Sequence, residues 1–358
     1  MFELNKKVKQ LTPYDPIAGS YRIRLDANES YITLPLDIKK EIADAVADIH
    51  YNRYPDPNAS AVCEGFANYF SLSQECVTAG NGSDELISVI MNAFLQKGDK
   101  VMTLEKDFSM YSFYTSIVEC KHIAFQKNND YSIDIDKVIE KANAENVRII
   151  IFSNPCNPTS CVLSREKVKR LVKSVNSLVV LDEAYMDFSD QSLISEFNKY
   201  DNLIILKTCS KAIGMAAIRL GFAVANKTIT NALKSVKSPY NVNTVTQVIG
   251  EIIFSHPEYI DSSIKRIIES RDSLYSRLCE IESEFPTRLK LTKPDTNFVF
   301  VESNEALQAF EYLKSVGIAV RLMGDKLRIT AGRNYENDAV CSEIENFLRG
   351  EKNEKSAN

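Results

Sequence analysis

The chain has 358 residues, of which 44% are hydrophobic and 25% charged, as in ordinary globular proteins. That length is enough for a large apolar core in roughly two or three domains. The net charge of −5 gives no electrostatic basis for binding nucleic acid or an anionic membrane, so the sequence predicts neither partner.

The cysteines and histidines are spread along the chain without the spacing of a metal site. Cys156 and Cys161 are the nearest cysteine pair, and no histidine stands beside them. The sequence therefore predicts no metal centre. The first residues lack the apolar stretch of a signal peptide, and no apolar run approaches the ~20 residues of a membrane span. We expect a cytoplasmic protein with reduced thiols.

The first thirty residues are predicted to form an arm, because the stretch "LTPYDPIAGS" carries two prolines and a glycine. Helices and strands alternate after this arm. Apolar residues recur at helical spacing over 85–95, and 165–175 is predicted to be an amphipathic helix. Continuous apolar strands separated by helices indicate a parallel sheet that helices cover on both faces. The strands are predicted at 100–104, 147–155, 177–185 and 202–210.

After residue 245 the sequence changes to a long charged helix and then to short strands. The helix is predicted over "YIDSSIKRIIESRDSLYSRLCEIESEF", and the strands over 297–303 and 326–332. We therefore expect a large domain, a smaller α+β domain and a disordered tail. The predicted divisions are 1–45 for the arm with part of the small domain, 46–245 for the large domain, 246–350 for the C-terminal small domain and 351–358 for the tail.

Polar residues follow the predicted strands at their carboxyl ends, where open parallel sheets collect ligands. Taken one at a time, each of these groups has a structural alternative. Ser83 could cap a helix, Asn157 could belong only to a turn, and Asp182 could cap the next segment. In chain order the groups are the segment "TAGNGSDE", Asn154 with Asn157, Asp182 with Tyr185, and Thr208 with Ser210 and Lys211.

Among these groups, Lys211 is the one that points most directly to a particular chemistry. An amine directly after a buried strand is poorly solvated and can act as a Schiff-base nucleophile, although it could also extend to solvent. A lysine amine, a carboxylate and a phosphate cradle are together what pyridoxal 5′-phosphate (PLP) requires of a protein. Lys211 would hold the cofactor covalently, and Asp182 would keep its ring nitrogen protonated. The 5′-phosphate would be bound by backbone N–H groups of Gly82, Ser83 and Asp84, the hydroxyls of Ser210 and Thr208, and the guanidinium of Arg219.

These motifs resemble a known family. "SKAIGMAAIRLGF" is similar to the lysine motif of the class II aminotransferases of PLP fold type I, and "GNGSDELI", "NPCNPT" and "LDEAY" stand in that family's order and spacing. "LTPYDP", "LDANES", "NRYPDP" and "LRITAG" resemble the histidinol-phosphate aminotransferases within it. The resemblance covers nearly the whole chain. It implies an α/β fold with a large domain, whose mostly parallel sheet is covered by helices, and a smaller α+β domain.

The resemblance also implies roles for further cofactor-binding residues. Asn157 and Tyr185 would hydrogen-bond the 3-oxygen of the PLP ring. Phe108 would stack on the ring, at a position where many relatives have a tyrosine. Tyr54 would reach the PLP phosphate of a partner subunit, which implies a homodimer with shared active sites.

The reaction that the resemblance implies is transamination of L-histidinol phosphate with 2-oxoglutarate, giving imidazole acetol phosphate and L-glutamate in histidine biosynthesis. Arg328 resembles the arginine that binds the carboxylate or phosphate of the substrate. The freed amine of Lys211 would act as general base and acid. The catalytic residues would be Lys211, Asp182 and Tyr185, and the remaining residues of the substrate pocket would be Arg321, Tyr14 and Asn28.

Besides Phe108, the chain departs from the family pattern at Cys156, which replaces an asparagine, and at Ser160, which replaces a glycine, and "LDANES" lacks the proline that commonly follows it. Two alternatives within the PLP enzymes have similar motifs: an aromatic amino-acid aminotransferase and a threonine-phosphate decarboxylase. A different class is the aminotransferase-like module of some transcription regulators. Such proteins carry a DNA-binding domain ahead of the module, whereas the first strand-like motif here, "RIRLDAN", begins at residue 22.

Overall fold

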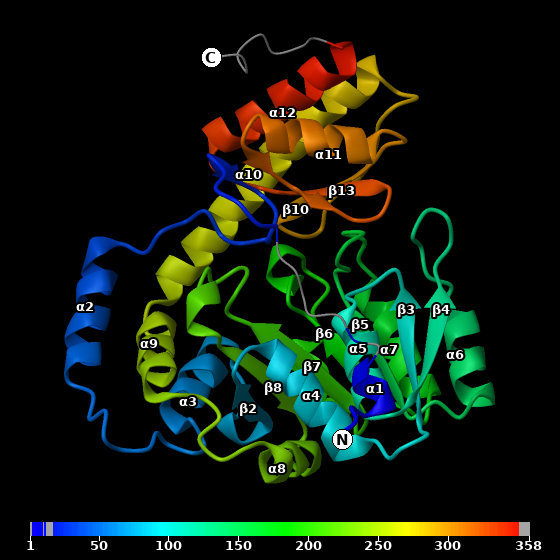
Figure 1. The fold of residues 1–358 in the computed structure, drawn as a ribbon. Coiled ribbons are helices and arrows are strands. Elements are labelled where there is room, and N and C mark those ends of the chain that lie inside the picture. The colour runs from blue at the N-terminus through cyan, green and yellow to red at the C-terminus, as the bar shows by residue number, and fades with distance from the viewer. Residues whose placement is uncertain (1, 10, 12–16, 351–358) are drawn as a thin grey trace.

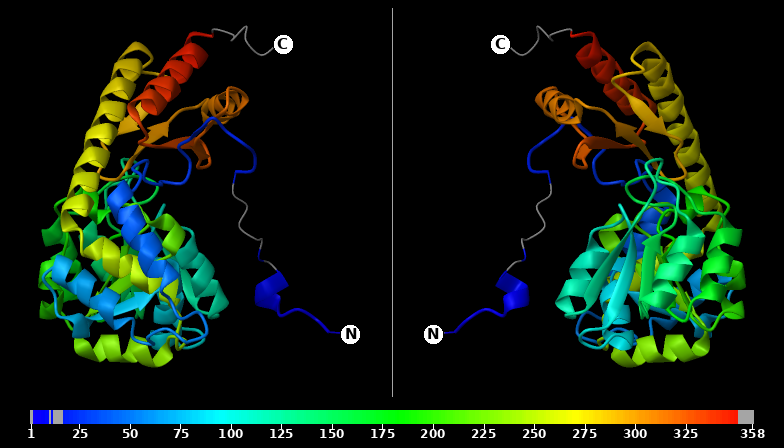
Figure 2. Two further views of the ribbon diagram at one scale, coloured as in Figure 1. Left: turned by 90° about the vertical axis from the view of Figure 1, so that its left-hand side faces the viewer. Right: turned by 90° about the vertical axis from the view of Figure 1, so that its right-hand side faces the viewer.

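The protein, represented by a computed structural model, consists of two lobes (Figure 1). The structure describes residues 2–9, 11 and 17–350, so Tyr14 and the predicted tail 351–358 lie outside the described residues. The lower lobe in Figure 1 holds a seven-stranded sheet between helices, and the upper lobe holds a four-stranded sheet with its own helices. Figure 2 shows that the long helix α10 (Pro257–Glu284) runs from one lobe into the other.

The central sheet consists of β2 (Val77–Gly80), β3 (Lys100–Glu105), β4 (Lys121–Gln126), β5 (Ile149–Ser153), β6 (Leu178–Asp182), β7 (Leu203–Thr208) and β8 (Gly221–Ala225). Its strand order is β2-β8-β7-β6-β5-β3-β4. β8 runs antiparallel to both of its neighbours, and the other adjacent pairs are parallel. The mostly parallel sheet is therefore confirmed. The predicted strands 147–155, 177–185 and 202–210 are longer than the observed β5, β6 and β7, because each predicted run includes the turn that follows the strand, whereas β3 is one residue longer than predicted.

Helices cover both faces of this sheet, and its central strands β5, β6 and β7 are accordingly apolar on both sides. On β6, Val180 packs in one apolar cluster with Ile90, whereas Leu181 packs in another cluster with Leu171. The first cluster lies under α4 (Ser83–Phe94), α5 (Met110–Ile117) and α8 (Lys227–Val236). The second lies under α3 (Ser60–Tyr69), α6 (Ile135–Ala144), α7 (Arg165–Ser174) and α9 (Thr244–Phe254).

Side-chain caps define where several of these helices begin. Asp134, Ser164, Asn226 and Asn243 each accept a hydrogen bond from the backbone N–H three residues later, at the starts of α6, α7, α8 and α9. α4 differs, because its N-cap is Gly82 and no side chain caps it. The first N–H groups of a helix have no partner within the helix, so those of α4 can bind a ligand.

The upper lobe is built by segments from both ends of the chain. Its antiparallel sheet has the order β12-β13-β10-β9 and packs against α10, α11 and α12. Near the N-terminus, β1 pairs in parallel with β11. The bounds are β1 Ile23–Arg24, β9 Lys290–Thr292, β10 Phe298–Glu302, α11 Ala306–Ser315, β11 Ile318–Ala319, β12 Arg321–Leu322, β13 Lys326–Thr330 and α12 Asn334–Arg349.

The remaining elements lie at the edges of the lower lobe. Helix α1 (Lys6–Lys9) contacts α5 through Lys7, whose Nζ donates to the backbone oxygen of Ile117 at 2.8 Å. Helix α2 (Leu36–Ala47) stands at the left in Figure 1 and packs on α9. Within the described ranges, every helix is too short or too polar to cross a membrane. The short 3-10 turns are η1 Gln74–Cys76, η2 Met186–Phe188, η3 Ile194–Lys199 and η4 Ala216–Ile218.

Candidate active site

Three neighbouring strands of the central sheet end at one edge, beside predicted site residues. β5 ends at Ser153, β6 at Asp182 and β7 at Thr208, and Ser153 lies opposite Asp182 in the strand register. Because these strands are parallel, their carboxyl ends form the edge at which open sheets bind ligands. The turns that follow carry Asn157 and Lys211.

Asp182 is a buried carboxylate whose neighbours are hydrogen-bond donors and other carboxylates. Its Oδ2 accepts from the hydroxyl of Tyr111 at 2.7 Å, and its Oδ1 accepts from the N–H of Ala184 at 3.1 Å. Within the described part of the chain, the charged groups that act on it most are Asp107 and Asp84. Burial raises the pKa of Asp182 to about 7; the donors oppose this rise and the two carboxylates add to it.

A second carboxylate, that of the half-buried Asp107, fixes the turn after β5. It accepts from the N–H of Ser153 at 3.1 Å, from the N–H of Phe108 at 2.7 Å and from the hydroxyl of Ser153. The Ser153 oxygen in turn accepts from the N–H of Asn157 at 3.1 Å. Burial raises the pKa of Asp107 to about 6. This series of bonds holds Asn157, the predicted ring ligand, against the end of β5.

An anion cradle lies at the start of α4, and its shape depends on two glycines. Gly82 has φ 83°, and a Cβ there would lie 2.8 Å from Nη2 of Arg219. A Cβ on Gly221 would lie 2.5 Å from the backbone nitrogen of Ser83. Nη1 of Arg219 donates to the Ser210 hydroxyl at 3.1 Å. The helix N–H groups, a hydroxyl and a guanidinium therefore converge as a phosphate requires.

Thr208 and Asp84 flank this cradle. The Thr208 hydroxyl oxygen accepts from the N–H of Ser210 at 3.2 Å, which orients Ser210. Asp84 contributes a backbone N–H from the first turn of α4, and its carboxylate lies 3.6 Å from Nη2 of Arg219. The Thr208 hydroxyl therefore orients Ser210, and the Asp84 side chain orients the arginine.

Lys211 is half-buried in the loop after β7. Its Nζ donates to the backbone oxygen of Ala27 at 3.0 Å and lies 5.9 Å from the centre of the Tyr185 ring. The Tyr185 hydroxyl accepts from Nδ2 of Asn28 at 2.8 Å. The Asn28 side chain is held by Thr330, whose hydroxyl donates to Oδ1 at 3.0 Å. The structure thus brings the predicted lysine, phenol and amide together.

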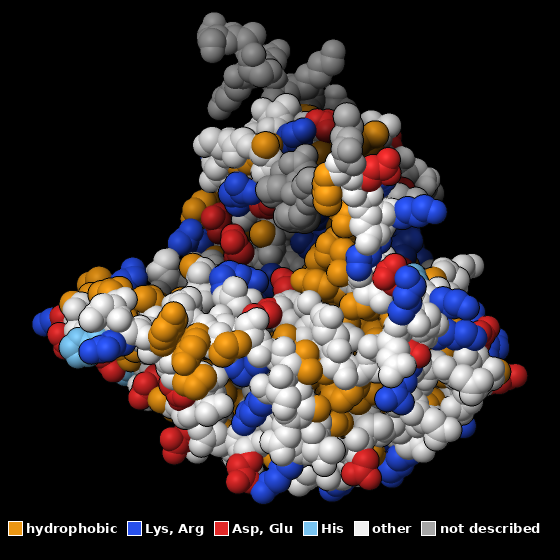
Figure 3. Space-filling view, turned by 60° about the horizontal axis from the view of Figure 1, so that its bottom comes forward, with side chains coloured by type: hydrophobic (Ala, Val, Ile, Leu, Met, Phe, Trp, Pro, Cys, Tyr) orange, Lys and Arg blue, Asp and Glu red, His pale blue; other side chains and the backbone are white. Residues whose placement is uncertain are grey.

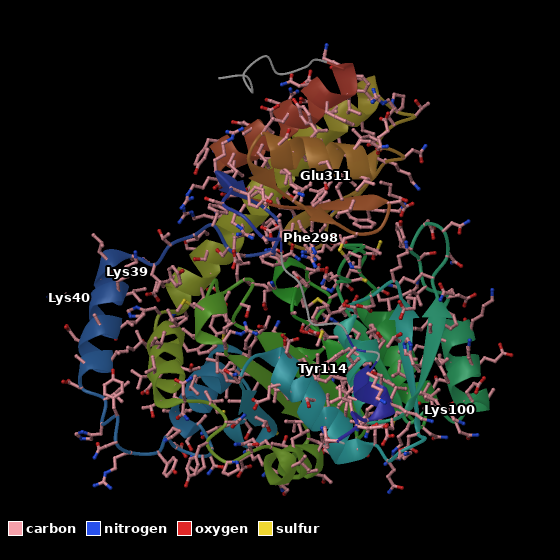
Figure 4. The ribbon with its side chains drawn as sticks, in the orientation of Figure 1. Lys39, Lys40, Lys100, Tyr114, Phe298 and Glu311 are labelled. Atoms are coloured by element: carbon pink, nitrogen blue, oxygen red, sulfur yellow. The ribbon has the colours of Figure 1, made fainter. Side chains whose placement is uncertain are left out.

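Arg328 joins the upper lobe to the turn after β5. Its Nη1 donates to Oδ1 of Asn157 at 2.7 Å, and its Nη2 donates to the backbone oxygen of Asp26 at 2.6 Å. Its guanidinium lies 5.4 Å from the ring centre of Phe298, which Figure 4 labels where β10 meets the lower lobe. Arg321 is opposite Arg328 in the register of β12 and β13.

The two predicted aromatic ligands lie in different environments. Phe108 is half-buried beside the site, with its ring edge-on to Tyr111 and 5.6 Å between ring centres. Tyr54 is 82% exposed and stacks on Tyr240 with 4.6 Å between ring centres. The structure therefore brings Phe108 to the site, whereas the ring contact of Tyr54 within its own chain is to Tyr240.

The residues present fit PLP in two features of the protein itself. At the start of α4, side chains at positions 82 and 221 would fill the space next to Arg219 and Ser83, which suits a bound phosphate. At the end of β6, the buried Asp182 would be complemented by a cationic ring nitrogen. Lys211 lies in the adjoining loop.

Sequence reasoning missed Asp107, Ser153 and Tyr111. Asp107 closely follows the predicted strand 100–104, so the rule that ligands collect at carboxyl ends could have found it. Tyr111 lies among the apolar residues of α5 and resembles any core tyrosine. Its hydrogen bond to Asp182 joins residues 71 positions apart in sequence, so no local sequence pattern predicts it.

Comparisons with known proteins extend these observations. Residues 21–344 match the family model for aminotransferases of class I and II. The chain is 40% identical over 351 residues to histidinol-phosphate aminotransferase from Clostridium novyi (strain NT), covering 97% of this chain and 96% of that protein. It is 38% identical over 349 residues to the protein of the same name from Clostridium kluyveri, covering 96% and 98%. The crystal structure of histidinol-phosphate aminotransferase from Sinorhizobium meliloti in complex with pyridoxal-5′-phosphate has a similar fold, with a TM-score of 0.87 and 20% identity over 98% of both chains.

Proposed function

The chain belongs to the class I and II aminotransferase family, and from this premise we propose that it transfers the amino group of L-histidinol phosphate to 2-oxoglutarate with PLP as cofactor. The products are imidazole acetol phosphate and L-glutamate, and the reaction is a step of histidine biosynthesis. The observation that carries this substrate assignment is the 40% identity to a histidinol-phosphate aminotransferase over 97% of the chain. We assign the enzyme to the cytoplasm, where its eight free cysteines stay reduced.

When bound, PLP supplies an aldehyde that captures the substrate amine and a ring that accepts electrons from the substrate carbon. Lys211 is the residue that we assign to hold the aldehyde. The cradle at the start of α4 supports a phosphate site, because it combines helix N–H groups with the guanidinium of Arg219. The residues assigned to the phosphate are Gly82, Ser83, Asp84, Thr208, Ser210 and Arg219, and those assigned to the ring are Phe108, Asn157, Asp182 and Tyr185.

The assigned catalytic residues act on protons and charge. The Nζ of Lys211 removes the proton from the substrate carbon that bears the amine and later returns a proton. Asp182, as an anion, stabilises positive charge on the ring nitrogen. The Tyr185 hydroxyl, oriented by Asn28, donates to the ring oxygen. Each of these groups has a fixed neighbour in the structure, which supports preorganisation of the site.

Arg328 is assigned to the phosphate of histidinol phosphate and to a carboxylate of 2-oxoglutarate. Arg328 is 8% exposed, and its guanidinium is oriented by Asn157 and by the backbone of Asp26. A guanidinium binds either anion through paired N–H groups, so one residue can serve two unlike substrates. Arg321, Tyr14 and Asn28 are assigned to the same pocket, with Tyr14 outside the described residues.

A product assay separates this function from its two alternatives. The purified protein with PLP and 2-oxoglutarate is given L-histidinol phosphate, an aromatic amino acid or L-threonine O-3-phosphate in separate reactions. We expect the highest kcat/KM for glutamate formation with L-histidinol phosphate, and no carbon dioxide from the threonine phosphate. Faster glutamate formation from the aromatic amino acid, or release of carbon dioxide, would favour the corresponding alternative.

We also propose a homodimer in which Tyr54 binds the PLP phosphate of the partner subunit. Figure 3 shows hydrophobic side chains gathered at the left of the molecule, on the side where Figure 1 places α2. Among the exposed large hydrophobic residues of this part of the chain, Leu36 is 83%, Tyr51 68% and Tyr54 82% exposed. A two-fold partner would cover such a surface and would place two equivalent sites at one interface.

Subunit exchange tests the shared site. Tyr54→Phe and Lys211→Ala, each impaired alone, are mixed and allowed to form heterodimers. One site then collects both substitutions and the other has neither, so part of the lost activity should return. If Tyr54→Phe is impaired and the heterodimers recover nothing, Tyr54 serves its own subunit and the proposal is wrong.

A further inference from the structure

The hydroxyl of Tyr111 has one hydrogen-bond partner among the described residues, the carboxylate of Asp182. Tyr111 is fully buried, and its oxygen donates to Oδ2 of Asp182 at 2.7 Å. Its ring packs in the apolar cluster between α4, α5 and the sheet, edge-on to Phe108. A phenylalanine would supply the same apolar ring without a buried polar atom that needs a partner. Packing at this position therefore requires only the ring of Tyr111, and its hydroxyl serves the hydrogen bond to Asp182.

Asp182 needs this donor because its charged neighbours are carboxylates, which disfavour the anionic form of Asp182. Asp107 in the loop before α5 and Asp84 in the first turn of α4 are both carboxylates, and both raise the pKa of Asp182. In the loop after β7, the amine of Lys211 donates to the backbone oxygen of Ala27. Tyr111 makes the largest opposing contribution, followed by the N–H of Ala184. The phenol itself stays protonated, because burial and the carboxylate raise the pKa of Tyr111 well above its usual value.

We infer that Tyr111 is a positioning residue for amino-group transfer: its hydroxyl fixes the carboxylate of Asp182 in one orientation and keeps it anionic for the cationic ring nitrogen of the cofactor. This inference rests on the proposed function for the role of Asp182. Its geometric part stands on the protein alone, since Tyr111 and Ala184 donate to different oxygens of the carboxylate and so define the plane of the carboxyl group.

The first test is made on the protein without cofactor and compares Tyr111→Phe with a matched control, Tyr114→Phe. Tyr114 lies on the same helix, as Figure 4 labels, and is half-buried. The proteins carry ¹³C at the aspartate carboxyl carbon, and the titration is followed by NMR. The signal of Asp182 is identified as the one that is absent from the spectrum of Asp182→Asn. We expect Tyr111→Phe to raise the proton affinity of Asp182 about tenfold, as expected when a buried anion loses a donor, and Tyr114→Phe to leave it unchanged. An unchanged titration of Asp182 in Tyr111→Phe would overturn the inference.

The second test is kinetic and uses the enzyme loaded with PLP. Tyr111→Phe should lower kcat at neutral pH about tenfold or more, with the KM for L-histidinol phosphate changed less than about threefold. The loss should shrink as the pH rises, because Asp182 then ionises without help. A shifted titration with a parental kcat would mean that the bond does not serve the reaction, and it would overturn the inference as well.

Fluorinated tyrosine gives a measurement that does not depend on how well Tyr111→Phe folds. Growth with 3-fluorotyrosine makes every phenol a stronger donor without removing any ring. The titration of Asp182 should then move to lower pH, and no movement would contradict the inference. The inference and the proposed function fail separately, since the titrations need no turnover and the product assay does not depend on Tyr111.

Discussion

Asp182 and Glu183 are consecutive buried carboxylates at the end of β6, and their surroundings differ on the two sides of the sheet. Glu183 accepts from the hydroxyl of Ser192 at 2.6 Å and from the N–H of Leu193 at 3.0 Å, and its Oε2 lies 3.8 Å from Nζ of Lys207. That amine also donates to Asp187 at 2.6 Å. Asp182 lies on the face of Tyr111 and α5, and among the described residues its carboxylate is bonded only to neutral donors.

The difference is between a buried charge that is compensated within the chain and one that we propose serves the cofactor. Lys207 and its two carboxylates form an ion cluster that is complete within the chain, so their charges are compensated where they are buried. Asp182 has donors but no ion-paired cation among the described residues, so its charge is left for a ligand. The two lysines at the end of the neighbouring strand β7 follow the same division, since Lys207 is in the ion cluster and Lys211 is in the loop of the site.

Replacing Lys211 should give the largest effect and should act on function alone. We expect Lys211→Ala to lower kcat by about three orders of magnitude or more, because a covalent and acid–base group is lost. Its stability should fall by only about 1 kcal/mol, since within the described part of the chain the amine makes one hydrogen bond, to Ala27. The measurements are kcat and urea unfolding. Borohydride reduction of the parent, followed by peptide mapping, should place the cofactor on Lys211; a label elsewhere would contradict the assignment.

Replacing Lys207 should lower stability and leave catalysis largely intact. Lys207→Met leaves Glu183 and Asp187 buried without their cation, so the free energy of unfolding should fall by about 3–5 kcal/mol. The folded enzyme should keep most of its kcat. Lys97→Met, which removes an exposed partner of Glu119, is the matched control and should cost less than about 1 kcal/mol. Equal losses in the two variants would show that the cluster adds nothing beyond a surface pair.

The fold could be predicted from sequence because its central strands are buried on both faces. β3, β5, β6 and β7 appear as continuous apolar runs, and the predicted fold class is confirmed by the similarity to an aminotransferase structure with a TM-score of 0.87. β8 and the edge strand β4 were not predicted. The antiparallel direction of β8 depends on a loop that returns along the same sheet, which apolar periodicity does not encode. The division into domains at residues 45 and 245 stays a prediction.

The site could be located but its supporting contacts could not. Lys211, Asp182 and Asn157 follow predicted strands, so the rule for carboxyl ends placed them at one edge. The bonds from Asp107 to Ser153 and from Tyr111 to Asp182 join distant segments. Such pairs depend on how α5 and its preceding loop pack on the sheet, and a single sequence carries no signal for that packing.

The stability of the protein without cofactor should reveal the unpaired state of Asp182 through its pH dependence. In the folded protein the pKa of Asp182 is raised to about 7. The folded state therefore holds the Asp182 proton more tightly than the unfolded state does. The stability that this proton contributes is complete below the pKa of the unfolded chain and is lost as the pH rises through about 7. Asp182→Asn removes this loss. From pH 5 to pH 8, we expect the free energy of unfolding of the variant to gain about 2 kcal/mol on that of the parent. A constant difference across this range would contradict the raised pKa. Asp107 titrates in both proteins, so its contribution largely cancels.

The smallest effect is expected at Ser160, where the chain completes a contact between the lobes. Ser160 is buried with φ 62°, a left-handed conformation that favours glycine. Its hydroxyl lies 2.6 Å from the hydroxyl of Thr296 and accepts from the N–H of Asp295 at 3.0 Å. The same N–H also donates to the backbone oxygen of Ser160 at 3.3 Å, and the Thr296 hydroxyl donates to the backbone of Phe298 at 3.1 Å. Both partners therefore keep a bond when the hydroxyl is removed.

Two substitutions at this position separate the hydroxyl from the backbone. Ser160→Gly loses bonds worth about 1 kcal/mol but relieves backbone strain of about the same size, so its stability should change by less than about 1 kcal/mol. Ser160→Ala loses the same bonds and keeps the strained Cβ, so it should be the less stable of the two. Urea unfolding measures both, and kcat should stay near the parental value because Lys211 and Asp182 are untouched. If the alanine variant is at least as stable as the glycine variant, strain at Ser160 does not contribute, and the hydroxyl alone accounts for this contact between the lobes.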